Sequence, residues 1–334
     1  MKLVECVPNF SEGRDPVTID RIAKALSSVT GCQLLHVDSE HDTNRSVMTL
    51  MGEPEAVSEA AFEGIRTAVE TIDLKKHRGT HPRFGAADVV PFVPWEGVEM
   101  DACITLAKNL ATRCASLEIP VYLYGQATED PQRRYLADLR RGGFEGLARQ
   151  LSVLPPDRGP SAPHPTAGAI AIGAREVLVA WNITLKTTDL GLARRIARTL
   201  REFQAVTRDD EGRAVSRVNR GLPGLRSLGW HSARDGCVQV TSNITDWKQC
   251  PPHQVFEAVQ ALASQQGVRI RGSELVGMIP REALLIAGRH FGGETLGPDA
   301  AVAAAIDNLR LDRIVPFNPA ERIIEARLKK RRTS

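Results

Sequence analysis

The segment HRGTHPRFGAADVVPFVP, residues 77–94, concentrates side chains that exchange protons or bind anions just before an apolar stretch. His77 and His81 have the four-residue spacing at which two histidines on one helix share a metal ion. Gly79 and Pro82 flank His81, however, and proline disfavours helix at the residue before it, so we predict a loop and no metal site. A histidine held in such a loop is suited to act as a general base. A loop histidine that only bonds a backbone carbonyl is the alternative, and residue types alone leave both open.

Polar residues in neighbouring motifs are further candidates. Asp38, at the predicted end of the strand LLHVD, is suited to orient an imidazole or hold an amine, with a turn-capping aspartate as the alternative. Arg45 in DTNRS is suited to bind a carboxylate with two hydrogen bonds. The alternative is an arginine that lies in a turn and is exposed to solvent. Arg83 would attract carboxylates and keep a neighbouring histidine neutral by charge repulsion. Asn9, Asn44 and Asn182 are further predicted substrate contacts. Asp88, at the start of a strand, is predicted to be mainly structural.

The order of predicted elements places these residues. Apolar periodicity predicts a strand over 3–10, a helix over 15–29 that starts at Asp15 and Pro16, strands on both sides of a turn around 39–44, a helix over 53–72 and a strand over 87–94. Helices over 100–117 and 131–151, a strand over 120–125 and a proline-rich loop over 154–165 follow.

The second half repeats the same order. It predicts a strand over 168–185, a helix over 189–203, a hairpin over 225–244, a helix over 251–267 and a strand over 268–279, then helices and a strand-like RIVPF as an extension. Both halves therefore read β-α-β-β-α-β, the ferredoxin-like order. We predict an α+β protein of two tandem ferredoxin-like subdomains, 1–175 and 176–334, each sheet having helices on one face.

Composition narrows the class of protein. The 334 residues are 42% hydrophobic and 25% charged, as in ordinary globular proteins. No signal peptide and no run of about 20 apolar residues is visible, so we expect a soluble, cytoplasmic protein without membrane contact. The six cysteines form no CxxC pair, which predicts reduced thiols. With 5% aromatic residues and a net charge of +3 that is concentrated in the tail RLKKRRTS, nucleic-acid binding is not expected.

Six motifs carry a resemblance to a known family. VECVPNFSEGR, DTNRSV, the 77–94 segment, PVYLYG, VQVTSNITD and GSELVGMIP together resemble the formiminotransferase family, from residue 1 to about 287. The resemblance implies transfer of the formimino group from N-formimino-L-glutamate to N5 of tetrahydrofolate, giving L-glutamate and 5-formiminotetrahydrofolate, a late step of histidine degradation. It implies that His81 is the essential histidine and that folate lies in a groove between two ferredoxin-like subdomains.

The resemblance also implies partners and a folate loop. The loop comprises Gly159, Pro160, Ser161, Ala162, Pro163, His164, Pro165, Thr166, Ala167 and Gly168, where Ala162 and His164 are details that vary among members. Tetrahydrofolate is the co-substrate, no metal is implied, and a homodimer is expected. Because this chain ends before a cyclodeaminase domain would fit, a separate cyclodeaminase is the expected pathway partner.

Three alternatives stay open. The donor could be N-formyl-L-glutamate, which differs from the formimino donor at one atom and would make the protein a formyltransferase. A folate-binding module without activity is a second alternative, although the intact HRGTHPR argues against it. A nucleic-acid binder built on twin ferredoxin-like sheets is the third, and it would need more aromatic residues than this chain has.

Overall fold

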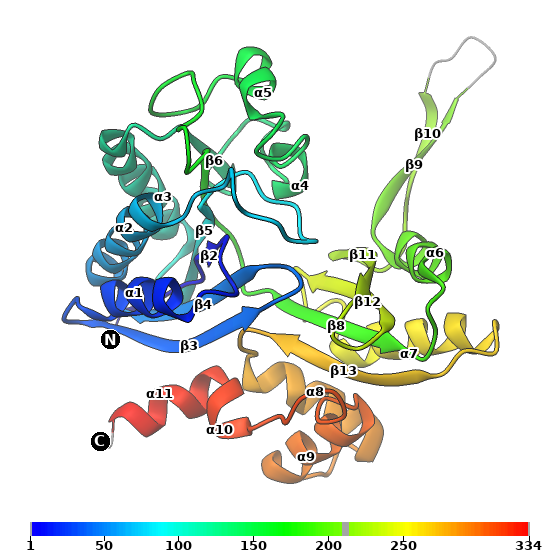
Figure 1. The fold of residues 1–334 in the computed structure, drawn as a ribbon. Coiled ribbons are helices and arrows are strands. Elements are labelled where there is room, and N and C mark those ends of the chain that lie inside the picture. Colours follow the sequence, from blue (N-terminus) through cyan, green and yellow to red (C-terminus); the bar gives the residue numbers. More distant parts are fainter. Residues whose placement is uncertain (1, 209–213, 333–334) are drawn as a thin grey trace. The chain divides into compact units, whose positions relative to one another are not determined.

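The computed structural model describes residues 2–208 and 214–332. The chain divides into two compact units, Met1–Glu176 and Val177–Ser334. Each unit combines a β-sheet with α-helices, as Figure 1 shows, so the predicted α+β class is confirmed.

The first unit is built on a seven-stranded sheet. Its elements in chain order are β1 Leu3–Cys6, β2 Asn9–Phe10, α1 Pro16–Ser27, β3 Cys32–Glu40, β4 Arg45–Gly52, α2 Pro54–Thr71, β5 Ala87–Glu96, α3 Met100–Cys114, the short 3-10 helix Ala115–Leu117, β6 Val121–Gly125, α4 Leu136–Leu139, α5 Leu147–Val153 and β7 Ile170–Ala174. β4 lies between β3 and the pair β1 and β2, which in turn pair with β5. These pairings are antiparallel, whereas β7 lies parallel to both β5 and β6.

Helices cover both faces of this sheet. α1, α2 and α3 lie along one face (Figure 1) and pack on apolar residues such as Val90 and Ile172. On the other face, leucines of α4 and α5 pack against Tyr122 and Tyr124 of β6. The prediction of helices on one face is therefore wrong for this unit, because β6 and β7 extend the sheet and their second face also needs cover.

Local signals set several element boundaries. Asp15 caps α1 by accepting hydrogen bonds from the backbone N–H groups of Val17 and Thr18, and Pro16 is the first helical residue, as predicted. The predicted helix over 131–151 is wrong, since α4 and α5 are separated by Gly142 and Gly143, which both have positive φ. β3 continues to Glu40, so Asp38 lies inside the strand and not at its end.

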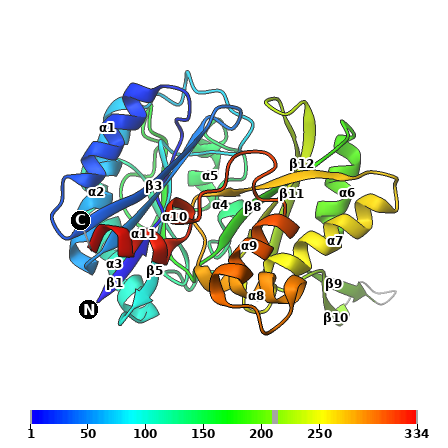
Figure 2. The same cartoon turned by 90° about the horizontal axis from the view of Figure 1, so that it is seen from below.

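The second unit is built on a four-stranded antiparallel sheet. Its elements in chain order are β8 Val179–Leu185, α6 Leu190–Leu200, β9 Phe203–Arg208, β10 Ala214–Arg220, β11 Leu225–Ser232, β12 Cys237–Ile244, α7 Pro252–Ser264, β13 Ile270–Val276, α8 Arg281–Gly292, α9 Pro298–Asn308, α10 Pro319–Arg322 and α11 Ile324–Arg332. The strand order is β11-β12-β8-β13, and β9 and β10 form a separate two-stranded sheet. Figure 2 shows α8 and α9 side by side.

Two predictions fail in this part of the chain, and one hairpin was missed. The stretch 168–185 is two strands in different sheets, β7 and β8, because the units divide at Glu176 and Val177. The hairpin of β9 and β10 was not predicted. RIVPF at 313–317 contains no strand; these residues form a turn that lies against β13, where Gly272 leaves room for the Cβ of Arg313.

Candidate active site

The segment from Lys75 to Ala86 is an irregular loop between α2 and β5. Backbone hydrogen bonds hold it at several points, including Thr80 N–H to Asp42 O at 3.1 Å and Ala86 N–H to Ala167 O at 2.9 Å. A Cβ on Gly79 would lie 2.1 Å from the carbonyl oxygen of Thr43, so only glycine allows this close approach. The loop predicted around His81 is thus confirmed, and it is tied down at both ends.

His77 is buried, and both of its ring nitrogens have partners. Its Nε2 lies 2.8 Å from the carbonyl oxygen of Asn44, and its Nδ1 lies 3.1 Å from Nε of Arg83. A guanidinium only donates, so Nδ1 accepts and Nε2–H donates to the carbonyl. Burial lowers the pKa of His77, aided by the charge of Arg83. His77 is therefore a neutral, structural residue of the loop.

His81, the predicted base, has one ring nitrogen bonded to the backbone. Its Nδ1 lies 2.7 Å from the carbonyl oxygen of Pro82, so Nδ1 carries the proton and Nε2 is the unprotonated nitrogen of the neutral ring. Removal from water, and then the charges of Arg45 and Arg140, hold the pKa of His81 well below its ordinary value, against the opposing charge of Asp88. The ring is consequently neutral at pH 7 and able to accept a proton.

Two arginines share one carboxylate next to this histidine. Nη1 of Arg45 lies 2.8 Å and Nη2 of Arg140 lies 2.5 Å from the same oxygen of Asp88, which is fully buried. The other oxygen of Asp88 accepts hydrogen bonds from the backbone N–H groups of Phe84 and Gly85 at 2.9 and 3.3 Å. Burial alone would raise the pKa of Asp88, but Arg140 and Arg45 outweigh it and hold that pKa well below its ordinary value.

This cluster has more positive than negative charge. Burial and the neighbouring Arg140 lower the pKa of Arg45 to about 10, against the pull of Asp88, so both arginines are still charged at pH 7. Nε of Arg140 is buried and donates to no acceptor in the part of the chain that the structure describes. Two guanidinium groups against one carboxylate, with a buried donor left over, give the cluster a net positive charge and an unused hydrogen-bond donor.

The predicted substrate residues Asn9, Asn44 and Arg45 lie close together, with Asn9 bonded to Arg45 and Asn44 bonded to the loop. Oδ1 of Asn9 accepts from Nε and Nη2 of Arg45 at 3.0 and 2.8 Å. Asn44 has φ +50, and its side chain links the backbone N–H of Gly13 to the carbonyl oxygen of Arg78. Arg45 is buried against Asp88 and is not a solvated turn residue.

Arg83 and Asp38 differ from their predicted surroundings. Arg83 forms a two-bond ion pair with Glu145, at 2.9 and 2.8 Å. The histidine that its charge acts on is His77, while Arg45 and Arg140 have that effect on His81. The prediction that Arg83 keeps the base neutral is therefore corrected. Asp38 is partly exposed within β3, where a carboxylate oxygen lies 3.9 Å from Nε2 of His36.

The predicted folate loop lies beside the His81 loop. Gly85 and Gly168 form an antiparallel bridge, and Ala169 N–H donates to Phe84 O at 3.1 Å. Nδ1 of His164 accepts from two backbone N–H groups within its own loop, which fixes the loop's second half. Residues 159–162 are exposed. Segments about 80 residues apart in sequence thus meet at one edge of the first unit.

Asn182, the last predicted contact, lies in the second unit on β8. It is 6% exposed, and its Oδ1 has no hydrogen-bond donor within the described ranges. Its neighbours in the sheet are Thr241 of β12 and Glu274 of β13.

Sequence reasoning missed Arg140 and undervalued Asp88. An aspartate inside the apolar run ADVVPF was a usable signal, because a buried carboxylate needs partners. Arg140 gave no such signal, since it lies in a run of charged residues after a short helix. Within residues 2–208 and 214–332, no three His, Cys, Asp or Glu side chains are grouped as a metal site would need, and no helix is long and apolar enough to span a membrane.

Comparison with known proteins gives the family. Residues 3–175 match the formiminotransferase domain, N-terminal subdomain, and residues 180–329 match the formiminotransferase domain. The chain belongs to the formiminotransferase family.

Individual relatives fall into two groups. The chain is 38% identical to the glutamate formimidoyltransferase of Thermoplasma acidophilum, over 87% of this chain and 92% of that protein. It is 36% identical to the enzyme of the same name from Streptococcus pyogenes, over 87% and 93%. It is also 41% identical to the formimidoyltransferase-cyclodeaminase of Rattus norvegicus, over 97% of this chain. The chain spans 59% of the length of that relative.

Proposed function

We propose that this formiminotransferase-family chain transfers the formimino group of N-formimino-L-glutamate to N5 of tetrahydrofolate, giving L-glutamate and 5-formiminotetrahydrofolate. The observation that carries the proposal is a neutral histidine, His81, under the charges of the buried cluster of Arg45, Asp88 and Arg140, which has two arginines and one carboxylate. The names of the two glutamate formimidoyltransferases that it resembles support the same reaction.

The reaction needs a base that later becomes an acid. As N5 of the folate attacks the formimino carbon, Nε2 of His81 takes the proton of N5. A tetrahedral intermediate forms, the protonated ring returns the proton to the glutamate nitrogen, and the bond from carbon to that nitrogen breaks. No oxidation or reduction takes place, and His81 carries one proton from N5 of the folate to the glutamate nitrogen. A positioned base of this kind contributes about 10²–10⁴-fold to rate.

The arginine cluster fits the charge of the substrates. Both N-formimino-L-glutamate and tetrahydrofolate carry carboxylates, and guanidinium groups bind carboxylates with paired hydrogen bonds. Arg140, whose Nε lies buried without an acceptor, is the proposed carboxylate ligand. Asp88 and Asn9 hold Arg45 and Arg140 in place and are positioning residues. Asp38, Asn44 and Arg83 stay predictions as substrate contacts or catalytic supports.

Further features of the family are proposed on the same basis. The strand order of the second unit and the β3-β4-β1-β5 part of the first support two ferredoxin-like subdomains, 1–175 and 176–334. The loop Gly159–Gly168 is the proposed folate contact because it is bonded to the His81 loop. A folate groove, Asn182 as a contact, a homodimer, a cytoplasmic location, a separate cyclodeaminase and catalysis without a metal stay predictions.

The test measures glutamate release. Purified protein is incubated with tetrahydrofolate and either N-formimino-L-glutamate or N-formyl-L-glutamate. Release from the formimino donor is expected, with a loss of at least 100-fold in kcat in His81→Ala and no loss in His231→Ala, which removes an exposed histidine of the second unit. Glutamate release from the formyl donor alone would show that the proposed donor is wrong. Full activity of His81→Ala would show that His81 is not the base.

A further inference from the structure

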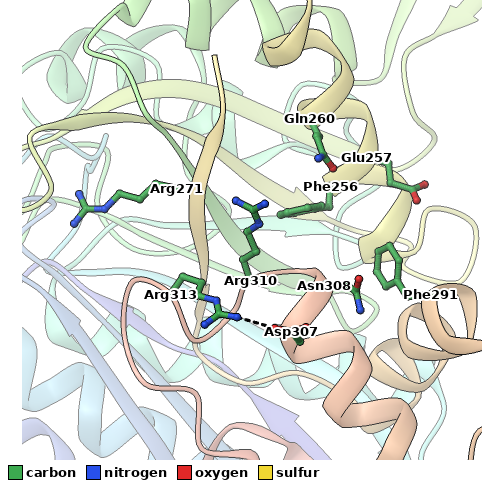
Figure 3. A pocket seen from close by; sticks show the side chains of 9 residues that line it. All are labelled: Phe256, Glu257, Gln260, Arg271, Phe291, Asp307, Asn308, Arg310 and Arg313. Carbon is green, nitrogen blue, oxygen red and sulfur yellow. Dashed lines mark hydrogen bonds and ion pairs between the residues drawn. The ribbon is translucent and has the colours of Figure 1, made fainter. Parts of the chain in front are cut away.

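A cavity of ≈ 510 Å³ lies in the second unit, and none of the side chains that line it belongs to the His81 cluster (Figure 3). Its walls come from α7, β13, α8, the end of α9 and the segment that follows α9. Sites for small molecules have volumes of roughly 300–1,000 Å³. The cavity is therefore large enough for a metabolite.

Arg310 lies in this cavity in an unusual backbone conformation. Its φ is +56, a left-handed conformation that favours glycine, yet the chain has an arginine there. The conformation is fixed by two backbone hydrogen bonds, from Arg310 N–H to Asp307 O at 3.1 Å and from Ser273 N–H to Arg310 O at 2.9 Å. Leu311 N–H also donates to Ile306 O at 3.0 Å, so Arg310 is the left-handed residue that ends α9. The end of the helix thus fixes the backbone from which the guanidinium group extends.

The cavity has one cation whose charge is not balanced. Nη1 of Arg310 donates to the carbonyl oxygen of Ile270 at 2.7 Å. Among the residues that the structure describes, no carboxylate forms an ion pair with Arg310. The carboxylates of the lining are already paired, Asp307 with Arg313 at 2.7 Å and Glu257 with His290 at 2.8 Å. The remaining donors of Arg310 are thus available for an anion.

The wall facing Arg310 comes from α7. Phe256 of α7 is 3% exposed and is held from behind by stacking on Trp181, with ring centroids 6.0 Å apart. Gln260 lies one helical turn further along α7, and Figure 3 shows Arg310 extending toward these two residues. We propose that the cavity binds a small organic anion, with its carboxylate or phosphate on Arg310.

The test uses two probes that differ in the anionic group, benzoate and phenyl phosphate, measured by isothermal titration calorimetry. At least one probe is expected to bind the full chain with one-to-one stoichiometry. Arg310→Gln should weaken that binding at least tenfold, because a charge-assisted hydrogen bond is lost. The probe that binds more tightly tells whether the natural ligand is a carboxylate or a phosphate.

Three further variants test where on the chain the probe binds. Arg310→Gly removes the guanidinium but suits the left-handed backbone, so it should lose binding while keeping the thermal midpoint. Arg198→Gln changes an exposed arginine of α6 and should bind the probe as the unchanged chain does. Arg140→Gln changes the carboxylate ligand proposed in the first unit, so any additional probe binding that this variant loses belongs to that cluster, while the binding that Arg310→Gln weakens should remain. If neither probe binds, or if Arg310→Gly binds as tightly as the unchanged chain, the proposed site is wrong.

Discussion

Arg140 and Asp88 meet at 2.5 Å, although Arg140 follows the short helix α4 and Asp88 lies near the start of β5. This contact brings a second positive charge next to a carboxylate that Arg45 already pairs with. One carboxylate then stabilises two guanidinium groups, and the excess charge lies beside His81. The geometry therefore links the proposed carboxylate site to the protonation state of the proposed base, and the predictions below separate the two effects.

Arg140→Gln should lower kcat/KM for N-formimino-L-glutamate by about 10–100-fold, because a hydrogen bond to a charged group contributes about 1.5–3 kcal/mol. Steady-state kinetics at fixed tetrahydrofolate check this. Arg141→Gln is the matched control, since the neighbouring side chain is exposed and pairs only with Asp138 within the described structure. Equal losses in both variants would contradict a specific role for Arg140.

The pH dependence of kcat/KM should reflect the low pKa of His81. A base is active when unprotonated, so activity should persist below pH 6.5 and fall only as the pH passes the lowered pKa of the histidine. Because the charge of Arg140 contributes to that lowering, Arg140→Gln should move the acid limb to higher pH. An acid limb that is unchanged in this variant would show that Arg140 does not act on the base.

Asp88→Asn should destabilise the first unit by about 3–5 kcal/mol, because it leaves buried arginine charge uncompensated. Urea unfolding at pH 7 measures the change, and Asp138→Asn, at an exposed position of α4, should be close to neutral. A loss below about 1 kcal/mol would mean that water reaches the cluster and screens it.

The same carboxylate predicts a direction for acid unfolding. The folded pKa of Asp88 lies below its unfolded value of about 3.9, so its contribution to stability is complete above that value and is lost as the pH falls through the folded pKa. Stability measured from pH 5 downward should fall less steeply in Asp88→Asn than in the unchanged chain. Parallel curves would assign the acid transition to other carboxylates.

Gly85→Ala should destabilise the protein by roughly 1–3 kcal/mol, because its Cβ would lie 1.9 Å from the carbonyl oxygen of Ala169 and the two loops would have to separate. Thermal unfolding and tetrahydrofolate binding check this together, and folate binding should weaken if the Gly159–Gly168 loop is the contact. At Gly297 an added Cβ meets no atom within 4 Å, so Gly297→Ala is the control.

Sequence patterns predicted what short stretches of chain determine. The start of α1 at Asp15 and Pro16, the strand β5 and the hairpin of β11 and β12 follow from capping, alternation and turn residues close in sequence. The division of 168–185 was not predictable in this way, because both strands are apolar and only the separate cores assign them to different sheets.

The candidate site was likewise predictable only where residues close in sequence determine it. His81 stood out by its motif, and the loop was predicted because Gly79 and Pro82 exclude a helix. Its charge environment was assigned to Arg83, the nearest arginine in sequence, whereas the acting charges come from Arg45 and Arg140. Contacts between residues far apart in sequence depend on the tertiary fold, which periodicity does not contain.

The bridge between Gly85 and Gly168 has a consequence for the order in which the protein assembles. β7 lies between β5 and β6 although it follows both in the chain, so the sheet is closed by its last strand. During synthesis the His81 loop therefore lacks its partner until about 80 further residues have left the ribosome. A nascent chain halted before Gly168 would hold every residue of the arginine cluster and still have no ordered site.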